Sequence, residues 1–142
     1  MARIDSAEKY GDDVVIGSIM DGTITEYVDS AVETIRTYVF GNCKELEHVD
    51  ISSVTKIDSG VFIDCSKLST LVLRNTSMAS LGSNALKNTP IAKNTGYIYV
   101  PRSLVDSYKA ATNWSTYAAQ FRALEDYTVD GTVDGDIDMS KI

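Results

Sequence analysis

Cys43 and Cys65 are the residue types best suited to chemistry, and they recur 22 positions apart in a repeated segment. They lack the C-x-x-C spacing of a redox pair. A zinc site needs four ligands, and the chain has one histidine, His48. Stacking of the repeats could bring the two residues within disulfide reach. Because cysteine is among the most often buried residue types, we expect two free thiols that serve packing, with no metal bound.

His48 and Asp50 are the next candidates, since a histidine beside an aspartate is part of a hydrolytic triad. On a strand, however, the pleat of the backbone sets the direction of both side chains, and this direction is not the geometry of a catalytic triad. G-x-S-x-G, P-loop, G-x-G-x-x-G and H-E-x-x-H motifs are all absent. We therefore expect no catalytic residues, no cofactor and no enzymatic activity. A hydrolase acting on cell-wall glycan remains the least favoured hypothesis.

The C-terminal residues 127–142 repeat T-V-D-G twice and are rich in aspartate. Aspartates at this spacing loosely resemble a calcium loop, but the closing glutamate of such a loop is missing. The favoured interpretation is an acidic extended tail that adds as a strand to a neighbouring molecule. Its candidate assembly residues are Tyr127, Val129, Val133 and Ile137.

The element that positions these side chains is one segment written twice, from Ile35 to Leu73. Six apolar or small positions recur at one fixed period, which is typical of stacked repeats with one strand and one turn each. Alternation in the last positions of each copy predicts a strand with one buried face. The predicted repeat core is Ile35, Phe40, Cys43, Leu46, Val49, Ile51, Ile57, Phe62, Cys65, Leu68, Leu71 and Leu73.

Side chains between the inward positions should face outward from the stacked strands. Stacking would align them into a patch of mixed polarity with two tyrosines at one end, and tyrosine is a good contact residue. An ordinary solvent-facing sheet is the alternative for any single residue. The candidate binding residues are His48, Asp50, Thr70, Val72, Arg74, Tyr97 and Tyr99.

Flanking segments are predicted to be helical caps. Residues 1–21 should form an N-terminal helix, and residues 22–101 hold the repeats, of which the third is degenerate, with Leu86 and Thr89 in place of Phe and Cys. Pro101 should end a strand that is either an edge strand or the final strand. Residues 102–126 should form two helices, the first capped by Ser103 and the second carrying an aromatic stripe from Trp114 to Leu124. Residues 1–126 are thus expected to form a single α+β domain, a short solenoid of about three coils with a small β-sheet.

Charge and composition limit the partners. The net charge is −7, concentrated in residues 125–142, so nucleic-acid binding is not expected. No stretch approaches ~18 uninterrupted apolar residues, so we expect no membrane span. The N-terminal residues carry acidic side chains where a secretory signal has an apolar run, which favours synthesis in the host cytoplasm without processing.

The pattern I-x-x-x-x-F-x-x-C-x-x-L-x-x-[VL]-x-[IL] resembles the BspA-type leucine-rich repeat across roughly residues 24–101. The run from T-P-I-A-K-N-T-G-Y-I-Y-V-P to the chain end is similar to the C-terminal cap of such proteins encoded by phages and prophages of gut Firmicutes. This resemblance implies a virion-associated gene product without a catalytic motif.

The favoured function is therefore a non-enzymatic phage virion protein of the tail, baseplate or capsid that serves assembly or host attachment. Its expected partners are other virion proteins, cell-surface proteins or host surface glycan, and we expect a homo-oligomer. The alternative is a bacterial adhesin-like or protein-interaction module that acts off the virion.

Overall fold

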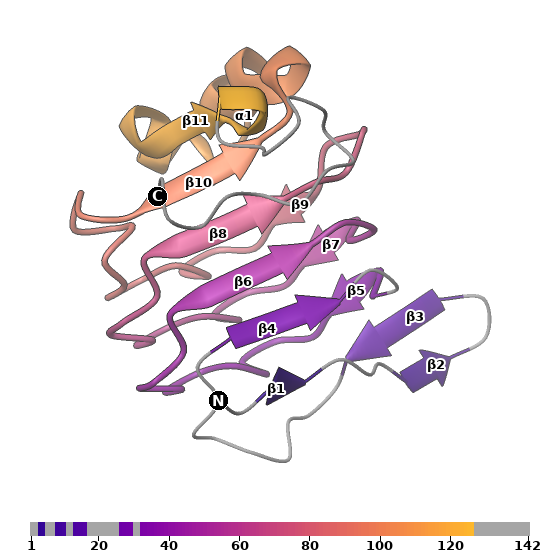
Figure 1. Ribbon diagram of the computed structural model, residues 1–142. Coiled ribbons are helices and arrows are strands. Elements are labelled where there is room, and N and C mark those ends of the chain that lie inside the picture. The colour runs from indigo at the N-terminus through magenta and orange to yellow at the C-terminus, as the bar shows by residue number, and fades with distance from the viewer. Residues whose placement is uncertain (1–2, 5–7, 11–12, 17–25, 30–31, 127–142) are drawn as a thin grey trace.

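The computed structural model describes residues 3–4, 8–10, 13–16, 26–29 and 32–126. In these residues two sheets run side by side along a stack of repeats (Figure 1). The large sheet has six strands in the order β1 (Arg3–Ile4), β4 (Glu26–Asp29), β6 (His48–Ile51), β8 (Thr70–Leu73), β10 (Tyr97–Val100) and β11 (Phe121–Ala123). The small sheet has five, in the order β2 (Glu8–Tyr10), β3 (Asp13–Ile16), β5 (Thr34–Ile35), β7 (Lys56–Ile57) and β9 (Ser80–Leu81).

Strand register follows the sequence repeat. Val49 pairs with Leu71 and Ile51 with Leu73 in the parallel β6–β8 ladder, as their equivalent repeat positions predict. Ile35 pairs with Ile57 in the small sheet by the same rule. A 22-residue step along the chain therefore moves one strand from β4 to β6 to β8 and from β5 to β7, whereas the next step is longer in both sheets. The chain has an α+β repeat fold.

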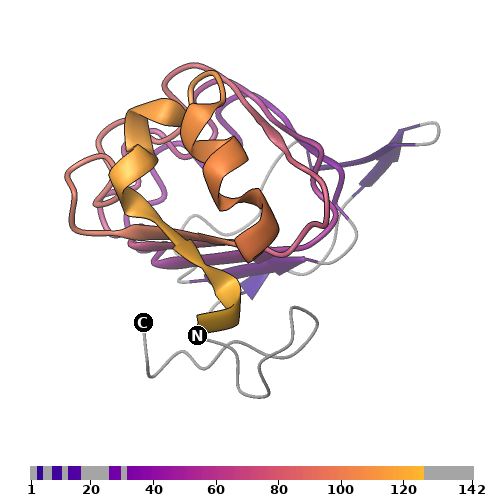
Figure 2. The ribbon, with the colours of Figure 1, turned by 90° about the horizontal axis from the view of Figure 1, so that it is seen from above.

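The core lies between the two sheets and the turns that join them, as the view along the stack shows (Figure 2). All twelve predicted core residues are buried. The Phe40 and Phe62 rings stack with centroids 5.5 Å apart, and Tyr27 continues the row at 4.8 Å from Phe40. Tyr27 was not among the predicted core residues, although it pairs with Val49 and is fully buried.

The turns repeat as regularly as the strands. Phe40 N donates to Val61 O, and Phe62 N donates to Ala85 O, so each turn is bonded to the next. In three successive turns, two positions have positive φ, where asparagine and glycine are best tolerated. These positions are Tyr38, Gly60 and Asn84 in one row and Asn42, Asp64 and Asn88 in the other.

The predicted N-terminal helix is wrong wherever the structure describes residues 1–21. β1, β2 and β3 lie there instead, and β3 pairs in parallel with β5. The run D-V-V-I in β3 is rich in β-branched residues, which favour extended backbone. Strand pairing also provides hydrogen-bond partners for the backbone of β5, which a helix does not.

The C-terminal segment is also less helical than predicted. It contains 3₁₀-helix η1 (Arg102–Leu104), helix α1 (Val105–Ala110), 3₁₀-helix η2 (Ser115–Gln120) and 3₁₀-helix η3 (Leu124–Asp126). Ser103 lies inside η1, and the residue before α1, Leu104, makes no side-chain capping bond. The predicted second helix is wrong beyond Gln120, because Phe121–Ala123 forms β11. β11 pairs with β10, so β10 is not the edge strand that was expected.

Side chains of this segment close the free edge of β9. Trp114 Nε1 donates to Ala79 O at 2.8 Å, and Ala79 N donates to the Tyr108 hydroxyl at 2.8 Å. Asn113 Nδ2 donates to Leu81 O at 2.7 Å. Backbone groups that a further strand would otherwise pair are thereby satisfied.

Candidate functional site

The candidate binding residues lie on the outer surface of the large sheet, which we call the sheet face. Register places Glu26, His48, Thr70 and Tyr97 in one cross-strand row. Asp50, Val72, Tyr99 and Arg122 form the next row. Residues of the sheet face therefore lie in register across neighbouring strands.

The middle of the sheet face is buried. Thr70 is 2% exposed, Val72 1% and Tyr99 2%. Leu124 of η3 packs against Val72 and Tyr99 in a small second core. The expectation that these three residues face solvent is wrong. The chain continues from β11 into η3, and Leu124 there covers Val72 and Tyr99. The residues around them, such as His48, Asp50 and Tyr97, are half-buried.

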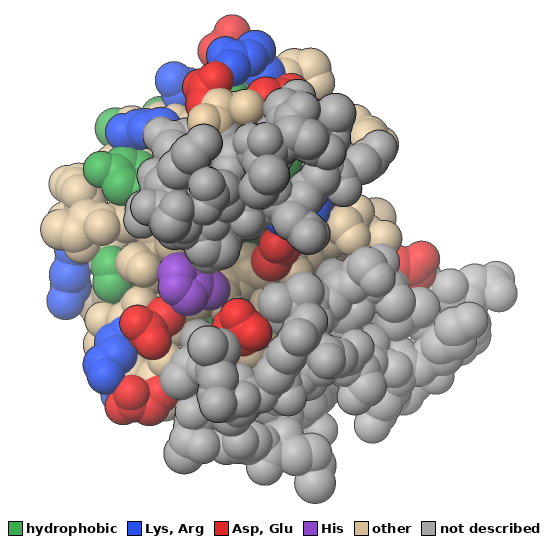
Figure 3. All heavy atoms as spheres, in the orientation of Figure 1, with side chains coloured by type: hydrophobic (Ala, Val, Ile, Leu, Met, Phe, Trp, Pro, Cys, Tyr) green, Lys and Arg blue, Asp and Glu red, His purple; other side chains and the backbone are tan. Residues whose placement is uncertain are grey.

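One end of the sheet face is acidic and contains His48 (Figure 3, where the single histidine is purple). Arg74 Nε and Nη2 donate to the two Asp50 carboxylate oxygens at 2.8 and 3.0 Å. Both side chains are partly buried, which holds this bidentate pair in one geometry. His48 Nδ1 is buried and has no hydrogen-bond partner. Because no hydrogen bond joins His48 Nδ1 to Asp50, the two side chains are not arranged as a catalytic base and its orienting carboxylate.

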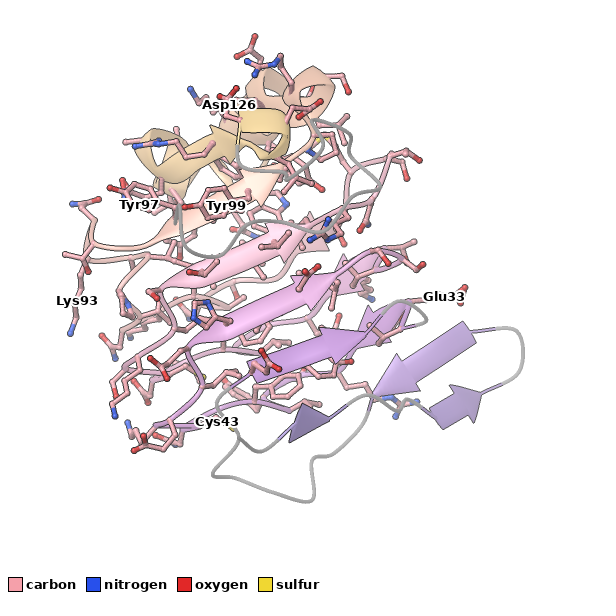
Figure 4. The ribbon with its side chains drawn as sticks, in the orientation of Figure 1. Glu33, Cys43, Lys93, Tyr97, Tyr99 and Asp126 are labelled. Atoms are coloured by element: carbon pink, nitrogen blue, oxygen red, sulfur yellow. The ribbon has the colours of Figure 1, made fainter. Side chains whose placement is uncertain are left out.

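The other end of the sheet face is aromatic. Tyr97 and Tyr99 lie side by side on β10, with ring centroids 6.4 Å apart (Figure 4). The Arg122 guanidinium carbon lies 4.6 Å from the Tyr97 ring centroid, a cation–π contact. Arg122 Nη1 also donates to Phe121 O at 2.8 Å, which satisfies a carbonyl of β11. Arg122 was missed from the sequence because its segment was predicted to be helical.

The two cysteines are free and buried, as predicted. Cys65 Sγ donates to Phe40 O at 2.9 Å. Burial raises the pKa of the Cys65 thiol to about 12 and also raises the pKa of Cys43. Both side chains are therefore neutral thiols near neutral pH, and packing is their role in this geometry.

The sequence predicts the absence of two further features, a metal site and a membrane span, and each can be compared with the described part of the chain. No cluster of three or more His, Cys, Asp or Glu side chains that could hold a metal lies within it. It also contains no helix with the length and apolar character needed to cross a membrane. The candidate tail residues Tyr127, Val129, Val133 and Ile137 lie outside the described residues.

Comparison with known proteins agrees with the repeat architecture. The model of the BspA type leucine rich repeat region matches residues 23–107 in six copies, which is more than half of the chain. No curated protein and no solved structure matches the chain. The chain therefore belongs to the BspA-type leucine-rich-repeat family.

Proposed function

We propose that this chain is a non-enzymatic virion protein whose leucine-rich-repeat domain binds a protein partner through the sheet face. Membership of a leucine-rich-repeat family supports a role in protein interaction. We choose the sheet face as the binding surface because its polar side chains are half-buried and held in fixed positions. Asp50 and Arg74 pair across neighbouring strands, and Arg122 lies over Tyr97.

The chemistry of the sheet face indicates the kind of partner. Arginine and tyrosine are enriched at protein interfaces, where they provide contact area and directed hydrogen bonds. Carboxylates lie at one end of the sheet face. The face also has two guanidinium groups, those of Arg74 and Arg122. A partner surface with both charge signs and an apolar centre would complement this arrangement. Host surface glycan is the other partner class that suits a tyrosine-bearing face.

The virion assignment rests on the resemblance of the segment from about Thr89 onward to caps of phage-encoded repeat proteins. It is tested by mass spectrometry of particles released from the encoding strain and purified on a density gradient. We expect the chain at a fixed ratio to the major capsid protein. Absence from the particles would overturn the virion role. Recovery at the bacterial surface instead would favour the alternative, an adhesin-like module.

The sheet face itself is tested by site-specific photo-cross-linking in purified particles. A photoreactive residue at His48 or Tyr97 should cross-link to one defined virion protein or to host surface material. The matched control is the same residue at Lys87, which is exposed on a turn. Equal cross-linking from Lys87 would contradict the assignment of the binding surface.

Homo-oligomerisation through the acidic tail is a further part of the proposal. Deleting residues 127–142 should lower the oligomeric mass measured by light scattering and leave the melting temperature nearly unchanged. Repeating the measurement with calcium and with a chelator tests the calcium-loop alternative. A monomer both before and after the deletion would count against the assembly role.

A further inference from the structure

Tyr38 occupies a position that its own local structure disfavours. It is 60% exposed, and it is the one large hydrophobic side chain of the described residues with such exposure. Its φ is +62°, in the left-handed region that a bulky side chain rarely adopts. The equivalent residues of the next two turns are Gly60 and Asn84, which tolerate this backbone. Tyr38 therefore combines an unfavourable backbone with little burial, a combination found most often at functional positions.

The Tyr38 ring is seated in a fixed place. It lies against Gly60, where a Cβ atom would come within 2.2 Å of Tyr38 Cε1. Tyr38 N also donates to Ser59 O, which ties the backbone of the tyrosine to the next turn. The absence of a side chain at Gly60 thus makes room for the ring, which holds a flat aromatic surface at the protein exterior.

A polar depression of ≈ 470 Å³ lies next to the turn that carries this ring, although the ring itself is not part of its lining. Thr37 and Ser59, the residues directly before Tyr38 and Gly60, line it together with Lys56, Asp58 and Ser80. Its floor includes Gly82, where a Cβ would meet Ser59 N at 2.3 Å, so the backbones of two turns are in close contact there. The volume lies within the usual range for small-molecule sites.

Polar groups around the depression are only loosely engaged with each other. Lys56 Nζ is 3.7 Å from Asp58 Oδ1, beyond hydrogen-bond distance. Ser59 Oγ is 3.4 Å from Ser83 Oγ, and Ser80 Oγ is 3.4 Å from Thr55 O. A carboxylate, an ammonium group and several hydroxyls thus retain hydrogen-bonding capacity that a ligand could use.

We propose that this depression binds one sugar unit of a glycan, and that the exposed Tyr38 ring on the adjoining turn contacts the same glycan. A pyranose has hydroxyl groups that pair with a carboxylate, an ammonium and serine or threonine hydroxyls. It also has an apolar C–H face that packs on the negative face of an aromatic ring. The site belongs to the small sheet, so it is separate from the sheet face and does not depend on the virion assignment.

The test is NMR titration of the full chain with methyl glycosides of glucose, galactose, N-acetylglucosamine and rhamnose. At least one should shift the amide signals of Tyr38, Ser59 and Gly82 with millimolar affinity and saturate. Glycerol and acetate are the controls for a polyol or an anion without a ring face. No shift with any glycoside, or shifts confined to Tyr97 and Arg122, would overturn the proposal.

Two variants sharpen the test. Tyr38→Asn keeps a residue that suits the backbone, as Asn84 does in a later turn, and it should weaken binding about tenfold or more. Asp58→Asn should weaken binding without affecting the ring. Glu45→Gln is the matched control, because Glu45 belongs to an exposed ion pair outside the depression. Unchanged affinity in both Tyr38→Asn and Asp58→Asn would refute the site.

Discussion

Trp114 Nε1 donates a hydrogen bond to the carbonyl oxygen of Ala79 across 2.8 Å, and this bond joins the C-terminal segment to the last short strand. The indole is 1% exposed and meets the Tyr108 ring edge-on at 5.1 Å. The Trp114 side chain therefore makes both a hydrogen bond and an apolar ring contact. Two different substitutions can measure the energetic contribution of each.

Trp114→Phe should cost about 1–3 kcal/mol of unfolding free energy, because it leaves the buried Ala79 carbonyl without its donor. Trp114→Ala should cost about 3–5 kcal/mol, because it also opens a cavity. Urea unfolding followed by circular dichroism measures both values. A Trp114→Phe protein as stable as the wild type would show that the hydrogen bond has no net effect.

Phe40→Ala or Phe62→Ala should each cost about 3–5 kcal/mol, since both rings are fully buried and stacked on each other. The same unfolding experiment applies, with Lys87→Ala as an exposed control expected within about 0.5 kcal/mol of the wild type. A loss below ~1 kcal/mol at either phenylalanine would mean that the repeat register is wrong.

Stability should fall as pH rises from 9.0 toward 12 because of Cys65. In the unfolded chain the thiol loses its proton near its ordinary pKa of 9.0, whereas burial raises the pKa to about 12 in the fold. The folded state then binds more protons than the unfolded state across this window. The contribution of Cys65 to the unfolding free energy is therefore complete below pH 9.0 and is lost progressively as pH rises toward 12. Tyr108, whose pKa burial also raises, adds a loss of the same sign.

Comparison of wild type with Cys65→Ala isolates the cysteine contribution. The difference in unfolding free energy between the two proteins should shrink as pH rises through the window. A difference that stays constant with pH would contradict the assignment. Thiol labelling provides a second readout, since Cys65 should react only after unfolding.

The Asp50–Arg74 pair should show measurable coupling in a double-mutant cycle with Asp50→Asn and Arg74→Met. We expect about 1–2 kcal/mol, because the pair is bidentate and its side chains are only 24% and 15% exposed. Glu45 and Lys67 provide the comparison cycle, with side chains 50% and 55% exposed. Solvent screens that second pair, so its coupling should be smaller, and the reverse order would contradict this argument.

The repeat core could be predicted because the same apolar pattern occurs in two successive segments of the sequence. The 22-residue period fixes which residues stack, and the burial of Phe40 and Phe62 follows from it. Tyr27 was missed because the segment around it lacks the full repeat pattern. It is recognised as core only through its pairing with Val49.

The ends of the stack could not be predicted in the same way. Trp114, Tyr117, Phe121 and Leu124 have helical spacing, yet the open edge of β10 places Phe121 on a strand. Tertiary hydrogen bonding outweighs local periodicity there. The same change moves Leu124 onto the sheet face, which is why Val72 and Tyr99 are buried and Arg122 joins the candidate site.

Closure of β9 by side chains has a consequence for assembly. Tyr108, Asn113 and Trp114 bind the backbone edge without presenting a strand of their own, so another molecule cannot extend the small sheet there by backbone pairing. Growth of the small sheet through β9 is therefore blocked. A second copy of the domain that contacts this end must therefore do so through side-chain surfaces.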